Sequence, residues 1–292
     1  MKNFFDIPAP FDRPENARAA IVSIPYERTV SYGAGAGRGP AAILAASRQV
    51  EHFDEVLQCE PFRVGIATEP LGAKASISAL PPRRMIERFG AVVGRHLDAG
   101  RFPVTLGGEH TIALAPFDAA IRRYPNLHVL HFDAHADLRD KYHNDPYSHA
   151  CVARRMAERA PLVQLGIRSY DREQADAIPA LPVKILHAHE IHAGRDPRKF
   201  AASHLGDPVY LTIDLDVFDP AEVPAVGTPE PGGLRWNDVD RVLGWLFANR
   251  TVVAMDVVEL APLRGLPASD FLAARLIYRA IGRRWADILA GA

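Results

Sequence analysis

Residues 102–137 have the sequence FPVTLGGEHTIALAPFDAAIRRYPNLHVLHFDAHAD, in which two apolar runs enclose a helical pattern. The runs Phe102–Leu106 and Leu127–Asp133 predict strands, and Thr111–Arg123 predicts the helix between them. A strand, a helix and a second strand in this order are typical of α/β proteins, where the two strands lie parallel in one sheet. The segment therefore indicates a parallel sheet, and the rest of the chain repeats the same alternation.

Five further apolar runs have little polar alternation, as expected for strands buried on both faces. They are Ala19–Ile24, Leu162–Ile167, Val183–Leu186, Val209–Asp214 and Thr251–Val258. Helical spacing predicts helices over Gly39–Gln49, Arg83–Asp98 and Ser269–Leu289. We expect one α/β domain over residues 1–292, with a mostly parallel sheet of about eight strands covered by helices on both sides. Periodicity alone leaves open whether that sheet is open or closed into a barrel.

The composition excludes several classes of protein. The chain has 292 residues, 48% hydrophobic and 24% charged, as expected for a globular protein with a sizeable core. Its 34 basic and 35 acidic residues nearly cancel, so no net field favours nucleic acid or an anionic membrane. Two cysteines cannot build a disulfide framework, and the first residues lack the pattern of a secretory signal. No run of about eighteen apolar residues is present, so we expect a cytoplasmic protein.

Carboxylates and histidines follow the predicted strands at spacing two. Asp133, His135 and Asp137 lie where one run ends, and Asp214 and Asp216 end another in the same way. Side chains at spacing two share one side of an extended chain, and parallel α/β proteins bind ligands at the carboxyl ends of their strands. Two neighbouring carboxylates repel each other when partly buried unless a cation compensates them. We therefore expect these side chains to converge on metal.

A third strand adds His110, which follows the glycine turn 107–108 and starts the next helix. On its own this pattern indicates only a capping turn. With the other strand ends it gives two imidazoles and four carboxylates, an oxygen-rich donor set too large for one tetrahedral zinc. Two divalent ions fit this set, with manganese the best match, and such a pair can share a water and generate hydroxide near neutral pH. The residues thus predict a metal-dependent hydrolase.

Five motifs, taken in order, are similar to those of the ureohydrolase family of arginases and agmatinases. They are GGEHT (107–111), DAHAD (133–137), IDLDVFDP (213–220), GTPEPGG (227–233) and DVVEL (256–260), and SYGAGAGRGPAAI (31–43) resembles the family's early glycine-rich segment. The resemblance implies a three-layer α/β/α fold, a binuclear manganese centre and hydrolysis of a guanidino group to urea and an amine. It also implies a homo-oligomer, either a trimer or a hexamer.

The resemblance further implies a role for each site residue. Asp133 and Asp214 would bridge two ions, and Asp137 would orient the bridging hydroxide toward the guanidinium carbon. The remaining ligands would be His110 and Asp137 on one ion, and His135 and Asp216 on the other.

Glu259, in DVVEL, would bind the guanidinium, since a planar fork of N–H donors suits a carboxylate. His149, in YSHACV, would carry a proton to the leaving amine, as its ordinary pKa near 6.5 allows. The alternative for Glu259 is an exposed acid at the end of a strand, and the alternative for His149 is an ordinary surface histidine. We expect Cys151, which has no evident base beside it, to be a packed thiol.

The segment LRDKYHNDPYS (138–148) narrows the substrate. Arginases have an Asn-, Thr- and Ser-rich stretch here that holds the substrate's carboxylate, and this chain lacks it. The segment is most similar to agmatinases, so we predict that agmatine is hydrolysed to putrescine and urea, a step of polyamine biosynthesis. Aminopropylagmatine, guanidinobutyrate and guanidinopropionate remain alternatives. Asp140, Asp145 and Glu230 are candidate partners for an ammonium group of the substrate.

Three other functions fit the sequence less well. A zinc amidohydrolase of the deacetylase type needs only three ligands, so His110, Asp137 and Asp216 would be superfluous. A non-catalytic binding protein would not need the complete ligand set together with Glu259. A dinucleotide-binding protein would need a full G-x-G-x-x-G, which the run GAGAGRG at 33–39 does not provide.

Overall fold

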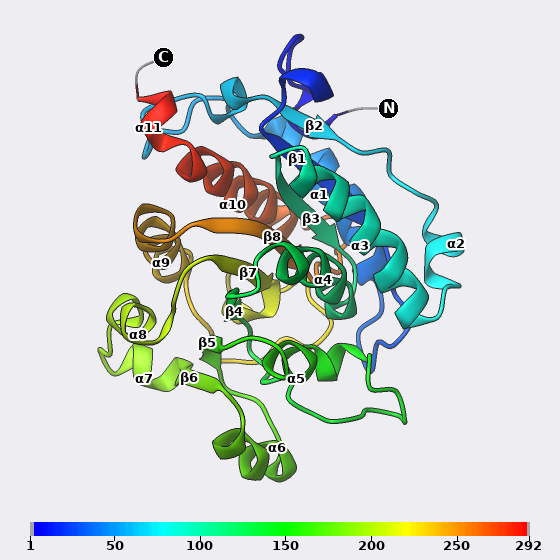
Figure 1. Ribbon diagram of the computed structural model, residues 1–292, viewed down its shortest axis with the longest axis vertical. Helices are drawn as coiled ribbons and strands as arrows, with labels where there is room; N and C mark the ends of the chain where they lie inside the picture. The colour runs from blue at the N-terminus through cyan, green and yellow to red at the C-terminus, as the bar shows by residue number, and fades with distance from the viewer. Residues whose placement is uncertain (1–2, 291–292) are drawn as a thin grey trace.

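Eight parallel strands form one sheet in the computed structural model, which describes residues 3–290 (Figure 1). The strands are β1 (Ala19–Ile24), β2 (Ile66–Thr68), β3 (Phe102–Gly107), β4 (His128–Phe132), β5 (Leu162–Ile167), β6 (Val183–His187), β7 (Val209–Asp214) and β8 (Val252–Val258). They pair in the order β2-β1-β3-β8-β7-β4-β5-β6. Since β2 and β6 are the two edges, the sheet is open and is not closed into a barrel.

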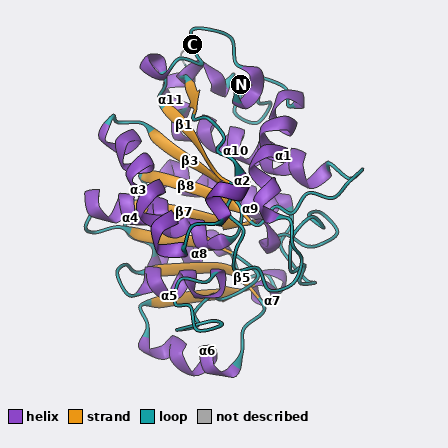
Figure 2. Ribbon diagram, turned by 90° about the vertical axis from the view of Figure 1, so that its right-hand side faces the viewer, coloured by secondary structure: helices purple, strands orange, loops and turns teal. Residues whose placement is uncertain are grey.

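Helices cover both faces of the sheet, which is the three-layer arrangement that the resemblance implies (Figure 2). One face packs against α3, α4 and α5, and the other against α1, α9 and α10, in two hydrophobic clusters. The helices are α1 (Gly39–Ala46), α2 (Lys74–Ser78), α3 (Pro82–Asp98), α4 (Leu114–Arg123), α5 (Val152–Ala157), α6 (Arg172–Ala177), α7 (Ala188–His192), α8 (Pro197–His204), α9 (Trp236–Asn249), α10 (Ala268–Arg284) and α11 (Ala286–Leu289). No helix within residues 3–290 is both long and apolar enough to cross a membrane.

Short 3-10 helices complete the chain. Three of them carry residues of the predicted site, namely η6 (His110–Ala113), η7 (His149–Cys151) and η9 (Leu215–Val217). The others are η1 (Phe4–Asp6), η2 (Pro14–Asn16), η3 (Ala36–Arg38), η4 (Ser47–Gln49), η5 (Pro61–Val64) and η8 (Ile178–Ala180).

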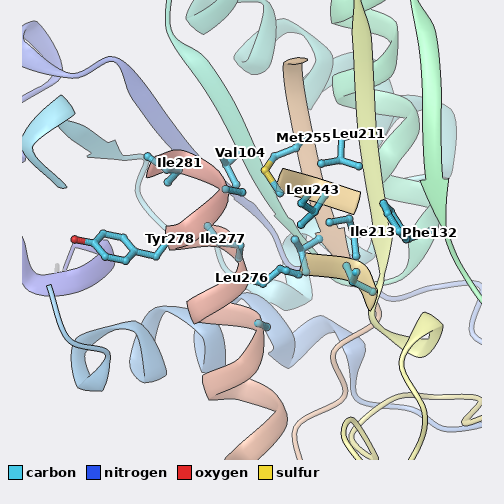
Figure 3. Close-up of a cluster of buried hydrophobic side chains, with 14 of the residues drawn as sticks. Val104, Phe132, Leu211, Ile213, Leu243, Met255, Leu276, Ile277, Tyr278 and Ile281 are labelled. Atoms are coloured by element: carbon cyan, nitrogen blue, oxygen red, sulfur yellow. The ribbon is translucent and has the colours of Figure 1, made fainter. Parts of the chain in front are cut away.

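The central strands are fully buried, because apolar side chains of both their faces pack against helices. Every residue of β1, β3, β5, β7 and β8 is buried. On one face, Leu276 and Ile277 of α10 and Leu243 of α9 pack toward Val104 and Met255 of the strands (Figure 3). A close-packed core of this kind deforms little, so the carboxyl ends of the strands are held in fixed relative positions.

The structure departs from the expected elements at a few termini. The predicted helix over 111–123 begins as η6, and the one over 39–49 ends as η4, because the terminal turns tighten into 3-10 geometry. The predicted helix over 269–289 is broken at Trp285, whose φ of −129° and ψ of 30° are not helical. β2 was not predicted, since its three residues are too few to show a period.

Candidate functional site

The carboxyl ends of four neighbouring strands carry the predicted site. β3, β8, β7 and β4 are adjacent in the sheet, and at their ends lie His110, Glu259, Asp214 and Asp133. A cavity of about 350 Å³ opens between the loops that follow these strands. It is lined by Glu259, His149 and five of the predicted ligands, His110, His135, Asp137, Asp214 and Asp216. Asp133, the sixth ligand, is buried against two of them.

His110 presents its Nδ1 atom to carboxylates. Its other ring nitrogen, Nε2, lies 2.9 Å from the hydroxyl of Thr212, which donates to Asp256 Oδ1 at 2.8 Å. Because the single hydroxyl proton goes to Asp256, Nε2 of His110 must be the nitrogen that donates to Thr212. Nδ1 therefore carries a lone pair in the neutral ring. This buried atom has no hydrogen-bond partner and lies between 3.1 and 3.5 Å from oxygens of Asp133, Asp137 and Asp214.

A buried lone pair that faces carboxylate oxygens is unfavourable unless a proton or a metal cation lies between them, and against the effect of burial Asp133 and Asp214 accordingly raise the pKa of His110 well above its ordinary value. His135 lies in a second group of donors, in which its Nδ1 atom is hydrogen-bonded to Asp216 Oδ2 at 2.9 Å and lies 3.6 Å from Asp133 Oδ1. Asp133 thus faces His110 with Oδ2 and His135 with Oδ1. The donors fit two divalent ions that share the carboxylate of Asp133.

The loops that carry these ligands are not extended, which corrects one expectation. Residues 133–137 lie beyond β4, and Asp137 has a left-handed φ of 50°, while Asp216 lies in η9. The side chains converge because backbone N–H groups hold the carboxylates. His135 N donates to Asp133 Oδ1 at 2.6 Å, and Asp216 N donates to Asp214 Oδ1 at 2.9 Å. The predicted convergence is confirmed, but alternation along an extended chain is not its cause.

Burial and charged neighbours shift the pKa of several groups in the site, and despite burial neighbouring histidines hold the pKa of Asp133 well below its usual range. Burial and the neighbouring Asp133 raise the pKa of Asp137 to about 8. Burial and the carboxylates of Asp216 and Asp133 raise the pKa of Asp214 well above its ordinary value. Burial alone would lower the pKa of His135, but Asp216 and Asp133 outweigh it and raise that pKa to about 12. The site concentrates negative charge that protons or cations neutralise, so metal binding should release protons.

His131 is a residue of the candidate site that sequence reasoning missed. Its ring is fully buried in β4, and its Nε2 atom lies 2.7 Å from Asp133 Oδ2. The amide nitrogen of Gln164 lies 2.9 Å from His131 Nδ1, so Nδ1 accepts and Nε2 donates to Asp133. Such hydrogen bonds orient metal-binding carboxylates. The spacing of His131 and Asp133 was a signal, because residues two apart in a strand point to the same face.

Glu259 and His149 both line the cavity. Glu259 directly follows β8 with a φ of 66°, and its Oε1 atom accepts from His110 N at 2.6 Å. Burial and the carboxylate of Glu109 raise the pKa of Glu259 to about 8. His149 is the first residue of η7 and is partly buried, and burial lowers its pKa to about 4. Both predicted residues are thus placed with the ligands.

The rim of the cavity does not contain the acids that were candidates for an ammonium group. Asp140, Asp145 and Glu230 are absent from its lining, and Asp140 pairs with Arg155 at 2.8 Å. The rim instead includes Tyr32, Tyr142, Tyr170, Gln174 and the ion pair of Arg139 with Asp171. Cys151 is buried with its pKa raised to about 12 by burial, in agreement with a packed thiol.

Two glycines let loops approach closely around the cavity. A Cβ atom on Gly108 would lie 1.9 Å from the carbonyl oxygen of Tyr26, so the turn before His110 requires glycine. A Cβ atom on Gly33 would lie 2.5 Å from the carbonyl oxygen of Gly227, and Gly33 N donates to that oxygen at 3.2 Å. The run GAGAGRG therefore serves loop packing beside the cavity.

Thr212→Val tests the orientation of His110. Valine has nearly the shape of threonine but leaves Nε2 of His110 without an acceptor, so we expect manganese affinity to fall by about 10- to 100-fold. Calorimetric titration of the metal-free protein with Mn²⁺ measures this, and Thr212→Ser, which keeps the hydroxyl, should bind within about threefold of wild type. Equal affinity of the valine variant and the wild type would show that the hydroxyl does not orient the ligand.

Comparisons with known proteins agree with this geometry. A model of the arginase family matches residues 17–282. The chain is 40% identical over 270 residues to the N(1)-aminopropylagmatine ureohydrolase of Thermus thermophilus, covering 92% of this chain and 90% of that protein. It is 34% identical over 260 residues to the agmatinase of Bacillus anthracis, covering 85% of each.

Among solved structures, the agmatine ureohydrolase of Thermoplasma volcanium is similar over its whole fold. The TM-score is 0.88 at 27% sequence identity, with 100% of this chain and 97% of that chain covered. The similarity therefore includes the sheet and the loops at its carboxyl edge.

Proposed function

Because the chain belongs to the arginase family, we propose that it hydrolyses the guanidino group of agmatine or a close derivative, releasing urea and an amine. One observation carries the proposal. The Nδ1 atoms of His110 and His135 share the carboxylate of Asp133 at a cavity that Glu259 also lines. A deacetylase-type zinc site would use fewer of these donors, and a non-catalytic protein would use none of them.

The ligand assignment is the one that the resemblance to the family implies. His110, Asp133, Asp137 and Asp214 would hold one ion, and Asp133, His135, Asp214 and Asp216 the other. Carboxylate oxygens and imidazoles suit manganese, which we propose as the metal. Two such ions, when bound, lower the pKa of a shared water toward neutrality and so supply a hydroxide nucleophile. The protein's own contribution is to orient the nucleophile through Asp137 and to hold the substrate.

Glu259 would hold the guanidinium of the substrate. Guanidinium is a poor electrophile stabilised by resonance, so its carbon must be placed accurately against the nucleophile. The Oε1 atom of Glu259 already accepts from His110 N, which fixes the carboxylate beside the metal ligands. The remaining acceptor positions of the carboxylate suit the N–H fork of a guanidinium.

His149 would deliver a proton to the leaving amine. The C–N bond breaks more easily when the departing nitrogen is protonated, and a positioned imidazole contributes about 10²- to 10⁴-fold to such a step. His149 lines the cavity with the metal ligands but is not bonded to any of them among the described residues. Its role is therefore separate from metal binding.

Two substrates fit the proposal. Agmatine is favoured by the absence of the arginase stretch in residues 138–148. N(1)-aminopropylagmatine is the second candidate, favoured by the 40% identical relative from Thermus thermophilus, and its hydrolysis would give spermidine in place of putrescine.

A urea-release panel with Mn²⁺ tests the proposal. It comprises agmatine, N(1)-aminopropylagmatine, arginine, guanidinobutyrate and guanidinopropionate. Residues 138–148 lack the stretch that holds the substrate's carboxylate in arginases, so kcat/KM for one of the first two should exceed that for arginine by about 100-fold. A preference for arginine would contradict the proposal. Metal analysis is the parallel measurement, since one zinc per chain would favour the deacetylase type.

A further inference from the structure

A chain of hydrogen bonds joins three residues from separate segments beside the cavity. The hydroxyl of Thr29, in the loop after β1, donates to Glu109 Oε1 at 2.8 Å. The same oxygen atom of Thr29 lies 2.9 Å from Nδ1 of His149 and 3.2 Å from its backbone nitrogen. Glu109, between β3 and η6, is fully buried. The chain therefore runs from a buried carboxylate through a hydroxyl to the histidine ring.

The direction of this chain follows from the donors around Glu109. Its Oε2 atom accepts from the backbone N–H groups of Arg28 and Thr29, both at 2.6 Å. Three donors thus converge on the two oxygens of this side chain, and the single hydroxyl proton of Thr29 goes to Oε1.

The protonation of the His149 ring then has one solution. Thr29 Oγ1 has given its proton to Glu109, so it can only accept from His149, and Nδ1 must carry the hydrogen. Ser148 Oγ, at 3.3 Å from Nδ1, is a longer second contact and can accept from the same hydrogen. The ring of Tyr142 meets the His149 ring edge to face, with centroids 5.7 Å apart. Both the tautomer and the orientation of the imidazole are thereby restricted.

We propose that Thr29 and Glu109 are positioning residues that hold His149 with its proton on Nδ1, so that Nε2 can take up the proton that the attacking water loses and give it to the leaving amine. The proposal rests on the proposed function of His149. A histidine that performs acid–base chemistry needs a third group to fix its tautomer, because the wrong tautomer has no lone pair where the proton must be taken. Here the third group would be the hydroxyl of Thr29, which is itself held by the carboxylate of Glu109.

Thr29→Val removes the hydroxyl and keeps the side-chain shape. With the preferred substrate and Mn²⁺, we expect kcat to fall by about 10- to 100-fold while KM stays within about twofold, because the substrate is still bound but its leaving amine is protonated slowly. Manganese content should remain at the wild-type value, since Thr29 contacts none of the proposed ligands. Thr29→Ser should restore kcat to within about threefold of wild type.

A double-mutant cycle separates positioning from a general structural role. If Thr29 acts through His149, Thr29→Val should change kcat by less than about twofold in the His149→Ala background. Equal losses in the two backgrounds would overturn the proposal. A metal content that falls with kcat in Thr29→Val would overturn it as well, since the effect would then lie in the metal centre.

Glu109→Gln should reverse the donor and acceptor roles along the chain from residue 109 through Thr29 to His149. The backbone N–H groups at Oε2 require an oxygen there, so the new amide nitrogen must face Thr29 and donate to it. The Thr29 hydroxyl would then donate to His149 Nδ1 and place the ring hydrogen on Nε2. We expect kcat to fall at least as far as in Thr29→Val, and unchanged kcat at full metal content would contradict the role of Glu109.

Failure of the proposed function is distinguishable from failure of this inference. A wild-type protein that releases no urea from any guanidino compound with Mn²⁺ bound contradicts the proposed function, and with it the role of His149. An active wild type with an equally active Thr29→Val variant overturns the positioning role alone.

Discussion

Asp133→Asn should abolish both metal loading and urea release. Asp133 faces the Nδ1 atoms of two histidines and also accepts from His131, so both its oxygens need to be acceptors. The amide of asparagine would present a donor to one of these positions and would remove a negative charge shared by two ions. Bound metal ions stabilise the transition state by several kcal/mol, so their loss predicts a fall in kcat of about a thousandfold or more.

Two measurements check this expectation. Manganese per chain, determined by elemental analysis after dialysis, should fall from about two toward zero, and urea release should fall with it. Asp140→Asn is the matched control, because Asp140 is exposed, pairs with Arg155 and lies outside the cavity lining. The control should keep its metal and its activity. An Asp133→Asn variant that retained two ions would contradict the bridging role.

Glu259→Gln should weaken substrate binding in the transition state without removing metal. The backbone N–H of His110 requires an oxygen at Oε1, so glutamine would turn its amide nitrogen toward the guanidinium. Two sets of N–H donors would then face each other, and the buried charge pair would be lost. Breaking such a pair costs about 2–5 kcal/mol, which predicts a fall in kcat/KM of about 30- to several thousandfold.

Steady-state kinetics with agmatine and N(1)-aminopropylagmatine measure this loss, with manganese content as the second readout. Glu222→Gln is a matched control, since Glu222 also accepts one backbone N–H, from Trp236 at 2.7 Å, but is not in the cavity lining. Its kcat/KM should stay within about twofold of wild type. If Glu259→Gln kept wild-type kcat/KM at full metal content, another residue would have to bind the guanidinium.

The residues of the candidate site could be predicted from the sequence because each of the six proposed ligands lies at or just beyond the end of an apolar run. Carboxyl ends of parallel strands lie at one edge of a sheet, so His110, Asp133 and Asp214 were expected at the same edge, whereas the strand order that brings them together could be seen only in the structure. The stated reason for the convergence within each loop was wrong, because the loops are turns and η9 is a 3-10 helix. Period-two reasoning applies only while the chain remains a strand.

The residues that orient the ligands could not be found in this way. Thr212 is 102 positions from His110, and Thr29 is 80 positions from Glu109. Threonine and glutamine are common in buried strands and loops, so their types carry no signal until the fold places them beside a histidine. His131 is the exception, because its spacing to Asp133 was visible. The direction of each hydrogen bond also depends on which donors and acceptors the fold brings together, and neither composition nor spacing in the sequence gives that information.

The strand order has a consequence for how the metal centre is completed during synthesis. β8 lies between β3 and β7, although it is the last strand to leave the ribosome. A nascent chain that ends before residue 252 therefore has a gap in the middle of the sheet, between His110 on one side and Asp214 on the other. The ion assigned to His110, Asp133, Asp137 and Asp214 would have ligands on both sides of that gap, so its capture would report that the chain has been made and inserted through β8. An incomplete chain would present its acids to solvent without a partner.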